Sequence, residues 1–367
     1  MVVDIHTIIY PDPLPIFHVK GSHREMGNQI GEAARPIIHH SVENIHHLIA
    51  DASETIHLTW DDAVAQAMPY MAIAKVIVPK YVEELRGMAE GANVTFEDLA
   101  VINALEEVVG DAIHITRCTS IGIQPERSVN GHVLLAHNED WQPPDESDVY
   151  LVHAEPEDEP TWLAMTYGGL LPNIGMNTAG IAQCINSVHP QDYQIGIPRV
   201  LISRAVLGAR SLEEAQGLIL TPGRAAGYNY LLGEQLGDLY CLESSGTRHA
   251  AIYPVDGVIA HTNHYLDSRM QQIEKPLDER LSTWDRLNRT LTLLKAAPFH
   301  NPYTLQTILS DHSGYPDSIC NHAAFGIEPL ERKTTICSLV MDLTDGIMTI
   351  CWGNPCTNGY HTYHLIS

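Results

Sequence analysis

A cysteine and a group of carboxylates lie about twenty residues apart, on either side of a predicted turn. Cys118 opens a short alternating run, residues 119–124, and a second run, residues 132–136, leads into the polar cluster His-Asn-Glu-Asp at 137–140. The dipeptide Asn130-Gly131 between the runs is typical of a hairpin turn. If the runs pair, thiol, amide and carboxylates share one end of a sheet, as nucleophilic catalysis requires. A buried, unreactive cysteine beside a polar loop is the structural alternative.

Other polar residues could complete such a site. His137, or His312 in the pair Asp311-His312, could act as the base of a Cys/His/Asp arrangement, although geometry decides such cases. Asn186 and Asn229 could each donate a side-chain amide to an oxyanion, an interaction worth about 2.7–4 kcal/mol in acyl transfer. Taken alone, a histidine or asparagine in such a loop, turn or strand more often has a structural role.

A metal site is not expected. The chain has 21 histidines, and His39, His40, His46 and His47 crowd one predicted helix. Pairs separated by seven residues lie two turns apart, about 10.5 Å along the axis, which is too far for one ion. The seven cysteines have irregular spacing and no CxxC pair, so they predict neither a disulfide framework nor a zinc site.

Composition narrows the class of protein. The 367 residues are 44% hydrophobic and 18% charged, which indicates a globular chain. The formal charge of −24, without a basic run, makes nucleic acids and anionic membranes poor partners and is compatible with an amine-bearing substrate. No apolar stretch reaches the roughly 18 residues of a membrane span. The N-terminus lacks the basic and apolar regions of a signal peptide, so we expect a soluble cytoplasmic protein.

The predicted secondary structure changes near Cys118 from mainly helices to mainly strands. After a strand at 16–20, the first third is predicted to be helical at 24–52, divided by Pro36, at 61–92, and from a capping box at Thr95 and Asp98 to about 109. Beyond it, alternating runs predict strands at 149–153, 162–167, 180–185, 229–232, 239–242, 251–253, 335–343 and 347–352. Helices are predicted at 198–207, 212–220, 266–295 and 302–309. Residues 175–180 are predicted to form a polar turn. This order favours an α+β fold.

Several motifs together resemble the N-terminal nucleophile hydrolases. The likeness is to the cysteine branch that contains acyl-coenzyme A:6-aminopenicillanate acyltransferases and N-β-alanyl-amine hydrolases, peptidase family C45. The motifs, in family order, are Cys118-Thr119-Ser120, Asn138-Glu139-Asp140, GMNTAGIAQCIN ending at Asn186, GYNYLLG around Asn229, Asp311-His312 with residues 316–320, and residues 334–355. They span most of the chain.

The resemblance implies a four-layer αββα fold and a precursor that cuts itself. The Arg117–Cys118 peptide bond would break, leaving a helical segment, 1–117, and a catalytic segment, 118–367, associated as one compact domain. Further assembly of these paired fragments is left open. The α-amino group of Cys118, with a pKa near 7.7–8.0, would serve as base for its own thiol, with a pKa near 8.5. We expect no cofactor and no metal.

Roles carry over to individual residues. The resemblance makes Cys118 the nucleophile, Asp140 the partner of the new amino terminus, and Asn229 the oxyanion donor. Asn186 corresponds to a second polar contact, and Ser120 to a hydroxyl that assists processing. Asn138 supports the site as part of the motif that contains Asp140.

Two positions depart from the family pattern. Arg117 stands where the family often has glycine. The family also has an arginine near the site further along the chain, and Arg332 lies in the corresponding region without a motif that aligns it.

The predicted function is therefore a self-processing cysteine amidohydrolase or acyltransferase acting on a small amide through an acyl-thioester on Cys118. Hydrolysis is favoured over transfer, because water needs no second binding site. Two alternatives stay open: a Cys/His/Asp hydrolase that does not cut itself, and a non-catalytic binding protein with the same fold in which Arg117 blocks maturation.

Overall fold

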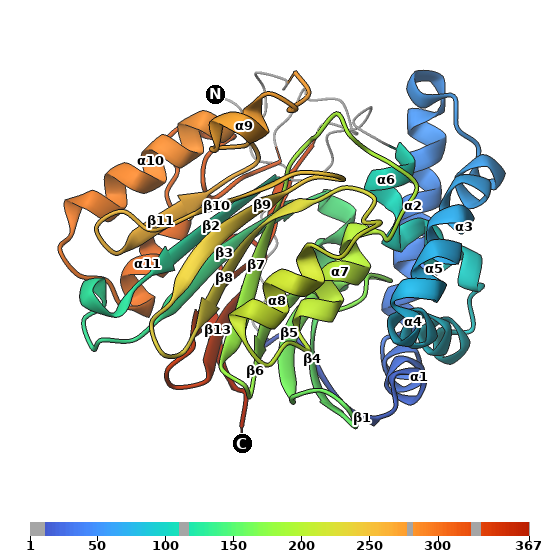
Figure 1. Ribbon diagram of the computed structural model, residues 1–367, viewed down its shortest axis with the longest axis horizontal. Helices are drawn as coiled ribbons and strands as arrows, with labels where there is room; N and C mark the ends of the chain where they lie inside the picture. Colours follow the sequence, from blue (N-terminus) through green and yellow to red (C-terminus); the bar gives the residue numbers. More distant parts are fainter. Residues whose placement is uncertain (1–11, 110–116, 277–281, 324–331, 367) are drawn as a thin grey trace.

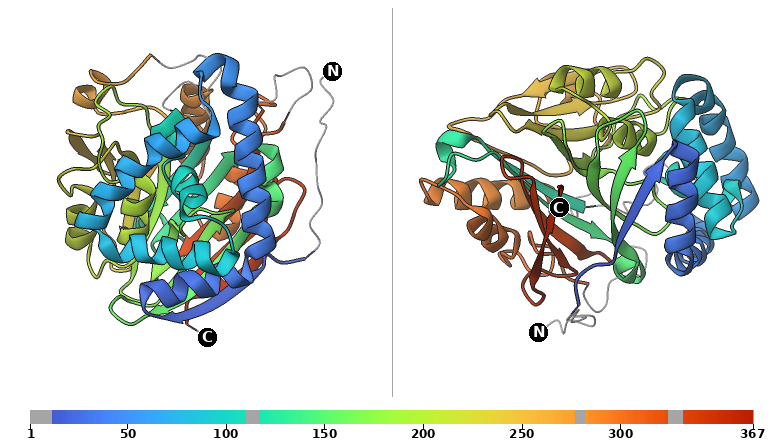
Figure 2. Two further views of the ribbon diagram at one scale, coloured as in Figure 1. Left: turned by 90° about the vertical axis from the view of Figure 1, so that its right-hand side faces the viewer. Right: turned by 90° about the horizontal axis from the view of Figure 1, so that it is seen from below.

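Two β-sheets pack face to face in the middle of the molecule (Figures 1 and 2). The computed structural model describes residues 12–109, 117–276, 282–323 and 332–366. Gly122 lies in contact distance of Leu231 and Leu239 of the opposite sheet, and Gly233 lies close to Leu135. The absence of side chains at these two glycines lets the sheets approach closely, so the main hydrophobic core fills the space between them.

The larger sheet has the order β1-β4-β5-β6-β7-β8-β9-β10. Its strands are β1 (Ile16–Gly21), β4 (Val149–Pro156), β5 (Trp162–Tyr167), β6 (Ile174–Asn177), β7 (Ile181–Ser187), β8 (Tyr228–Glu234), β9 (Leu239–Ser244) and β10 (His249–Ile252). Only β1 pairs in parallel, with β4, and the other neighbours are antiparallel. The edge strand β1 therefore joins the start of the chain to a sheet built from residues after 148.

The smaller sheet has the order β11-β2-β3-β12-β13-β14 and is antiparallel throughout. Its strands are β2 (Arg117–Ile123), β3 (Leu134–Trp141), β11 (Val258–His261), β12 (Thr334–Asp342), β13 (Ile347–Trp352) and β14 (Tyr360–His364). Every residue of β2 and β3 is buried, because the opposite sheet covers one face and helices cover the other. The sheet thus holds Cys118 in its interior.

Helices cover both outer faces (Figure 2). The outer face of the smaller sheet packs on α10 (Thr283–Ala296) and α11 (Pro302–Leu309), through a separate apolar cluster that includes Leu287, Leu294 and Leu305. The larger sheet is covered by α7 (Arg199–Val206) and α8 (Leu212–Ile219). A short helix, α9 (Ser268–Gln271), precedes α10. These four layers confirm the predicted αββα arrangement.

The N-terminal helices pack beside the sandwich, on the right in Figure 1. They are α1 (His23–Ala33), α2 (Arg35–Ile56), α3 (Trp60–Ile77), α4 (Pro79–Ala92), α5 (Phe96–Asn103) and α6 (Leu105–Val109). Helices α1 and α4 cross closely at glycines of both helices, since a Cβ on Gly27 would lie 1.9 Å from the carbonyl oxygen of Glu84. Within the described residues, no helix has the length and apolar character needed to cross a bilayer.

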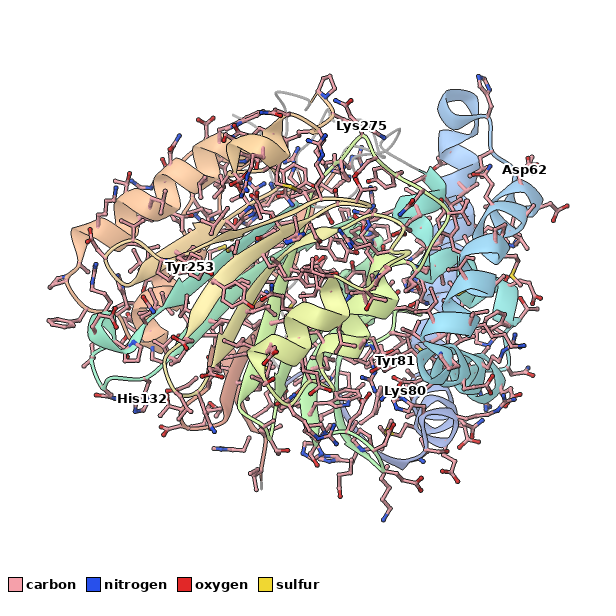
Figure 3. The ribbon with its side chains drawn as sticks, viewed as in Figure 1. Asp62, Lys80, Tyr81, His132, Tyr253 and Lys275 are labelled. Carbon is pink, nitrogen blue, oxygen red and sulfur yellow. The ribbon has the colours of Figure 1, made fainter. Side chains whose placement is uncertain are left out.

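Buried ion pairs tie these helices to the sandwich. Arg204 of α7 is fully buried and donates to Glu84 of α4 at 2.7 Å and to Glu159 at 3.1 Å. Tyr81 donates to Glu159 at 2.7 Å, and Lys80 lies 2.7 Å from the same carboxylate. Figure 3 labels Lys80 and Tyr81 at the start of α4. Since burying such charges is favourable only when they are paired, α4 and α7 hold each other in a fixed orientation.

The hairpin prediction is confirmed in its main feature and corrected in detail. Strands β2 and β3 pair so that Cys118 lies opposite Glu139. The connection between them is longer than a two-residue hairpin, because a 3₁₀ turn (Pro125–Arg127) precedes Asn130-Gly131. The polar residues 137–140 belong to β3 itself rather than to a loop beyond it, since β3 pairs with β12 as well as with β2.

Several other boundaries match and some do not. The predicted break near Pro36 falls at Ala34, and Thr95 and Asp98 form the predicted capping box. The single helix predicted at 266–295 is wrong, because its described parts are α9 and α10, with 277–281 outside the described residues. Residues 175–180 were predicted as a turn, but Ile174–Asn177 is strand β6 and the turn follows it.

Candidate active site

Cys118 lies near the start of strand β2, and the neighbouring strand β3 carries a carboxylate on each of its faces. Across the β2–β3 pair, Cys118 is opposite Glu139 and Arg117 is opposite Asp140. Because side chains alternate along a strand, Glu139 and Asp140 point to opposite faces of the sheet. The Glu139 face meets the larger sheet, and the Asp140 face meets α10. Cys118 therefore lies close to both carboxylates, Glu139 on one face of the sheet and Asp140 on the other.

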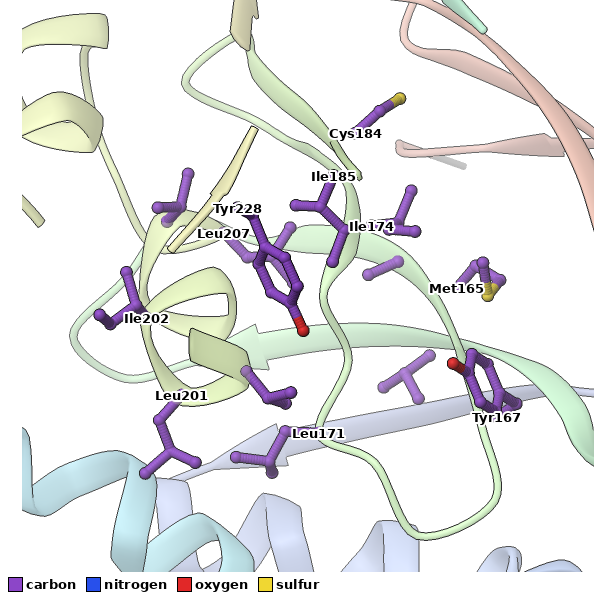
Figure 4. Packing of buried hydrophobic residues seen from close by; sticks show 14 of the residues in the cluster. Met165, Tyr167, Leu171, Ile174, Cys184, Ile185, Leu201, Ile202, Leu207 and Tyr228 are labelled. Atoms are coloured by element: carbon purple, nitrogen blue, oxygen red, sulfur yellow. The ribbon is translucent and has the colours of Figure 1, made fainter. Parts of the chain in front are cut away.

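A small cavity opens beside the Cys118 thiol, with a volume of about 40 Å³ for the centres of water-sized molecules. It lies between the ends of β2, β3, β7 and β8 and the helices α2, α5, α6 and α7. Figure 4 shows Ile185, Tyr167 and Tyr228, three of its lining residues, within the surrounding apolar packing. The remaining lining residues are Ser41, Ile45, Ile102, Leu105, Glu106, Cys118, Glu139, Trp141, Asp145, Leu170, Asn173, Ser187 and Val200. The wall is mainly apolar and carries three carboxyl groups.

The Cys118 thiol is buried and faces a carboxylate. Its Sγ lies 3.7 Å from Oε2 of Glu139. Burial, followed by the charges of Glu139 and Asp140, raises the pKa of this thiol well above its ordinary value, and Arg286 and the backbone of Ser187 oppose that shift only in part. The thiol is therefore protonated in the intact chain, and it needs a base before it can act as a nucleophile.

The backbone of Cys118 is held on both sides of its α-carbon. Its N–H donates to Oδ1 of Asn263 at 2.9 Å, and its carbonyl oxygen accepts from Nη1 of Arg286 at 2.6 Å. Nη2 of Arg286 also donates to Oδ1 of Asn263, at 2.8 Å. Both residues are buried, so this network fixes the main chain on the C-terminal side of the Arg117–Cys118 bond.

Asp140 has one oxygen occupied and one without a partner. Oδ1 accepts from the Thr335 hydroxyl at 2.6 Å, whereas Oδ2 is buried and has no hydrogen-bond partner among the described residues. Burial raises the pKa of Asp140 to about 7, and the nearby charge of Arg286 opposes this shift. An unpaired buried carboxylate oxygen is costly unless a donor reaches it. The arrangement suits a positively charged donor at this position.

Arg117, on the N-terminal side of the Arg117–Cys118 bond, is also held in place. Arg117 has a buried side chain and forms an ion pair with Asp317. The glycine that the family often has at this position would lack that contact.

The two candidate histidine bases lie in different surroundings. His137 is buried, with Nδ1 2.9 Å from Ser120 Oγ and Nε2 2.9 Å from Glu139 Oε2. The Glu139 carboxylate, rather than this ring, is therefore the group in contact with the Cys118 thiol. His312 does not line the cavity, and its Nε2 faces His322 at 3.1 Å.

The asparagine residues separate into two groups. Asn229 Nδ2 donates to Asn186 Oδ1 at 2.9 Å, and the two residues lie opposite each other on β8 and β7. Neither lines the cavity, although their neighbours Tyr228 and Ser187 do. Asn186 Nδ2 is a buried donor without a partner among the described residues. Asn138 instead donates to the carbonyl oxygens of Leu309 and Ile319 at 2.9 and 2.8 Å, so it anchors the loop after α11.

Two residues of the site, Asn263 and Arg286, are absent from the sequence prediction, whereas Glu139 belongs to the carboxylate cluster that was predicted beside Cys118. Arg286 shares the buried face of α10 with Leu287, Thr290 and Leu294. A charged residue on an otherwise buried helix face is a signal that could have identified it. Arg286, rather than the positional match Arg332, is the arginine that contacts Cys118.

The crowded histidines of α2 have separate partners. His39 lies 2.9 Å from the carbonyl oxygen of Ala92, and His40 lies 2.7 Å from Asp148. His46 stacks on Trp60 with ring centroids 3.5 Å apart. These contacts give the side chains structural roles on the helix surface.

The chain is similar to known enzymes over most of its length. The family model "Acyl-coenzyme A:6-aminopenicillanic acid acyl-transferase" matches residues 127–357. The acyl-coenzyme A:6-aminopenicillanic-acid-acyltransferase 40 kDa form of Emericella nidulans is 24% identical over 339 residues, 92% of each chain. The β-alanyl-dopamine/carcinine hydrolase of Drosophila melanogaster is 25% identical over 236 residues, 58% of this chain and 59% of that protein.

Solved structures of amide hydrolases are also similar. A mutant of the conjugated bile acid hydrolase from Clostridium perfringens matches with a TM-score of 0.45 and 13% identity, over 66% of this chain and 96% of that one. Penicillin V acylase from Agrobacterium tumefaciens matches with a TM-score of 0.45 and 17% identity, over 64% and 83%.

Proposed function

Because the chain belongs to the acyl-coenzyme A:6-aminopenicillanic acid acyltransferase family, and is thus an amide hydrolase or acyltransferase of the N-terminal nucleophile type, we propose that it is a self-processing cysteine amidohydrolase. Cleavage of the Arg117–Cys118 bond makes Cys118 the N-terminal nucleophile. The observation that carries this proposal is the network around the Cys118 main chain, in which Asn263 holds the nitrogen and Arg286 holds the carbonyl oxygen.

Maturation begins with attack of the Cys118 sulfur on the Arg117 carbonyl carbon. The C–N bond between Arg117 and Cys118 breaks, and the Arg117 carbonyl carbon forms a thioester with the Cys118 sulfur. The Cys118 nitrogen takes up the thiol proton and becomes an amine. Water then cleaves the thioester, which leaves a carboxylate on Arg117 and a free thiol. The Arg117–Asp317 ion pair and the Asn263–Arg286 network fix the two sides of the bond during these steps.

The new amino group supplies the missing base. An α-amino group has a pKa near 7.7–8.0, so at neutral pH it exchanges protons readily with a thiol. It forms where the Cys118 N–H now meets Asn263, next to the β3 residues that pair with β2. The partnerless Oδ2 of Asp140 is the acceptor that suits an ammonium group at this position. Asp140 then stabilises the protonated amine after it has taken the thiol proton.

In turnover, the sulfur attacks the amide carbonyl of the substrate. The oxyanion that forms is stabilised by the Asn186–Asn229 pair, which has an unpaired buried donor in Asn186 Nδ2. The amine product leaves with the proton held on the Cys118 amino group, and an acyl-thioester remains. Water, activated by the same amino group, hydrolyses it. Transfer to a second amine follows the same path with that amine in place of water.

The cavity favours a small amide that carries an amine. Its wall is mainly apolar, so it suits a compact aromatic or aliphatic group. Glu106, Glu139 and Asp145 add carboxyl groups, which suit a protonated amine. The β-alanyl-dopamine/carcinine hydrolase of Drosophila melanogaster, by its name, acts on amides of amines, in agreement with this substrate class.

Intact mass spectrometry tests self-processing. Wild-type protein is expected to give fragments of 117 and 367 − 117 = 250 residues, while Cys118→Ala stays whole. Cys184→Ala, at another buried cysteine, serves as the matched control and is expected to be cut. A wild-type chain that stays whole after prolonged incubation, yet is folded, would rule out self-processing.

A hydrolase that does not cut itself is the second candidate. It is favoured by one observation: ligand atoms of Cys118, His137 and Glu139 all lie within 4.8 Å of one another. This hypothesis predicts an intact chain whose Cys118 is acylated by an amide substrate, and His137→Gln would prevent that acylation.

A further inference from the structure

Four side chains from two loops converge on one point at the surface end of the smaller sheet. His312, Cys320 and His322 come from the loop after α11, and Cys356 comes from the loop after β13. One ligand atom of each lies within 4.8 Å of the others. Cys320 and His322 are buried, whereas His312 and Cys356 are exposed, so the point can be reached from solvent.

Hydrogen bonds alone do not account for this arrangement. His322 Nε2 lies 3.1 Å from His312 Nε2 and 3.4 Å from both Cys320 Sγ and Cys356 Sγ. An imidazole nitrogen has either one proton or one lone pair, so it can serve only one of these three neighbours. A cation bound between the four side chains would explain why two imidazole nitrogens face each other in this way. Each of the four groups would then donate a lone pair to that ion.

We propose that His312, Cys320, His322 and Cys356 bind one zinc ion in a tetrahedral Cys₂His₂ site. With Zn–N bonds of about 2.05 Å and Zn–S bonds of about 2.3 Å, the edges of such a tetrahedron are about 3.3 Å for N–N and about 3.6 Å for N–S. The observed distances, 3.1 Å and 3.4 Å, are close to these edges. Soft thiolates combined with imidazoles in this geometry select zinc over magnesium or calcium.

The surroundings suit thiolate ligands. Asn354 Nδ2 lies 3.6 Å from Cys320 Sγ, as a donor to a metal-bound sulfur would. Two thiolates also balance the charge of one zinc ion. The irregular spacing of these four residues explains why the sequence did not predict the site.

The ion would stabilise the neighbourhood of Asp140. Between two of the ligands lies Asn321, whose N–H donates to the Thr335 hydroxyl at 2.9 Å. That hydroxyl in turn donates to Asp140 Oδ1 at 2.6 Å. The same loop carries Asp317, the partner of Arg117. A zinc ion that holds this loop against residues 353–358 is therefore a structural element beneath the proposed active site, and it takes no part in the reaction.

A disulfide between Cys320 and Cys356 is the competing explanation for the two sulfurs. It would leave the approach of His312 to His322 unexplained, and it would remove both thiolate ligands. The two explanations differ in mass by two hydrogens and in metal content.

Metal analysis of the purified full-length chain tests the proposal. After incubation with zinc chloride and removal of excess metal, we expect about one zinc per chain, and the cobalt-substituted protein should show thiolate-to-cobalt charge-transfer bands and tetrahedral d–d bands. Cys356→Ser and His312→Ala, at the two exposed ligands, should each weaken zinc binding at least tenfold while the chain stays folded. Cys118→Ala, at a thiol outside the cluster, should retain the full metal content and the cobalt spectrum.

Three results would overturn the proposal. The first is a folded wild-type chain that binds neither zinc nor cobalt in a chelator competition. The second is a Cys320–Cys356 disulfide in protein purified without oxygen. The third is a cobalt spectrum that Cys356→Ser leaves unchanged. These readouts are independent of self-processing and of amide hydrolysis, so they test the zinc site separately from the proposed function.

Discussion

Arg286 donates from Nη1 to the carbonyl oxygen of Cys118 at 2.6 Å, so a guanidinium on α10 fixes the main chain of the proposed nucleophile. The same group holds Asn263, which accepts from the Cys118 N–H. One side chain thus controls the position of both polar groups of Cys118.

The first prediction concerns this contact. Arg286→Gln should slow appearance of the 250-residue fragment at least tenfold, because three charge-assisted hydrogen bonds, to Cys118, Thr119 and Asn263, are lost. A time course of intact mass measures the rate. Arg289→Gln, on the same helix but paired with Asp311 at the protein surface, should be processed at the wild-type rate. Equal slowing in both variants would indicate a general loss of helix stability instead.

The second prediction concerns the pH dependence of stability. Burial raises the pKa of Asp140 to about 7, so between about pH 4 and pH 7 the folded chain retains a proton that the unfolded chain has lost. The stabilising contribution of this group is present below about pH 4 and is lost as the pH rises through 7. In the uncut Cys118→Ala background, Asp140→Asn should therefore flatten the fall in unfolding free energy measured by urea titration between pH 5 and 8.

Other buried carboxyl groups also contribute to the fall of the unfolding free energy with pH. Burial also raises the pKa of Asp145 to about 7 and that of Asp148 to about 6, so part of the slope should remain in Asp140→Asn. An unchanged slope in that variant would contradict the raised pKa of Asp140.

The third prediction concerns the asparagine pair. Asn186→Leu and Asn229→Leu should each lower kcat by about 10²–10³, the usual effect of losing one oxyanion donor. Steady-state kinetics, corrected for the fraction of chain that is cut, measures this loss. If the pair has only a structural role, both variants lose unfolding free energy while kcat per matured site stays within a factor of about two.

The fourth prediction concerns substrate charge. Glu106 lines the cavity and accepts from Tyr228 at 2.6 Å and from Ser187 at 2.7 Å. Glu106→Gln should raise KM about tenfold for amides with a protonated amine and leave KM nearly unchanged for uncharged amides of similar shape. Glu213→Gln, which removes the same charge from a position on α8 outside the cavity, is the control. A parallel change for both substrate types would exclude a direct role in recognising the amine.

The sequence predicted the parts of this structure that depend on local patterns. Alternation identified β5 and β13 with their observed bounds, and turn and cap residues located the breaks near Pro36 and Thr95. Strands β11 and β14 were missed, because short strands with little alternation depend on their neighbours for stability.

The candidate site was predicted less completely for a related reason. Cys118 and Asp140 lie in one hairpin, so their proximity follows from local pairing. Asn263 and Arg286 reach Cys118 from 145 and 168 residues further along the chain, and only the packing of α10 and β11 on β2 brings them there. The four residues of the proposed zinc site meet in the same way, across two loops that no spacing rule connects.

The position of strand β1 predicts how the protein would behave after the proposed cleavage. It lies before Arg117, yet it forms the edge of the larger sheet by pairing with β4. After the cut, that sheet would be shared between two polypeptides. The ion pair between Glu84 of the first polypeptide and Arg204 of the second would also hold them together. Such a pair should withstand dilution without losing activity. Residues 118–367 produced alone would expose the bare edge of β4, and an uncovered strand edge invites aggregation. We therefore expect residues 1–117 to act as an intramolecular chaperone for residues 118–367, and to stay bound to them if the Arg117–Cys118 bond is cut.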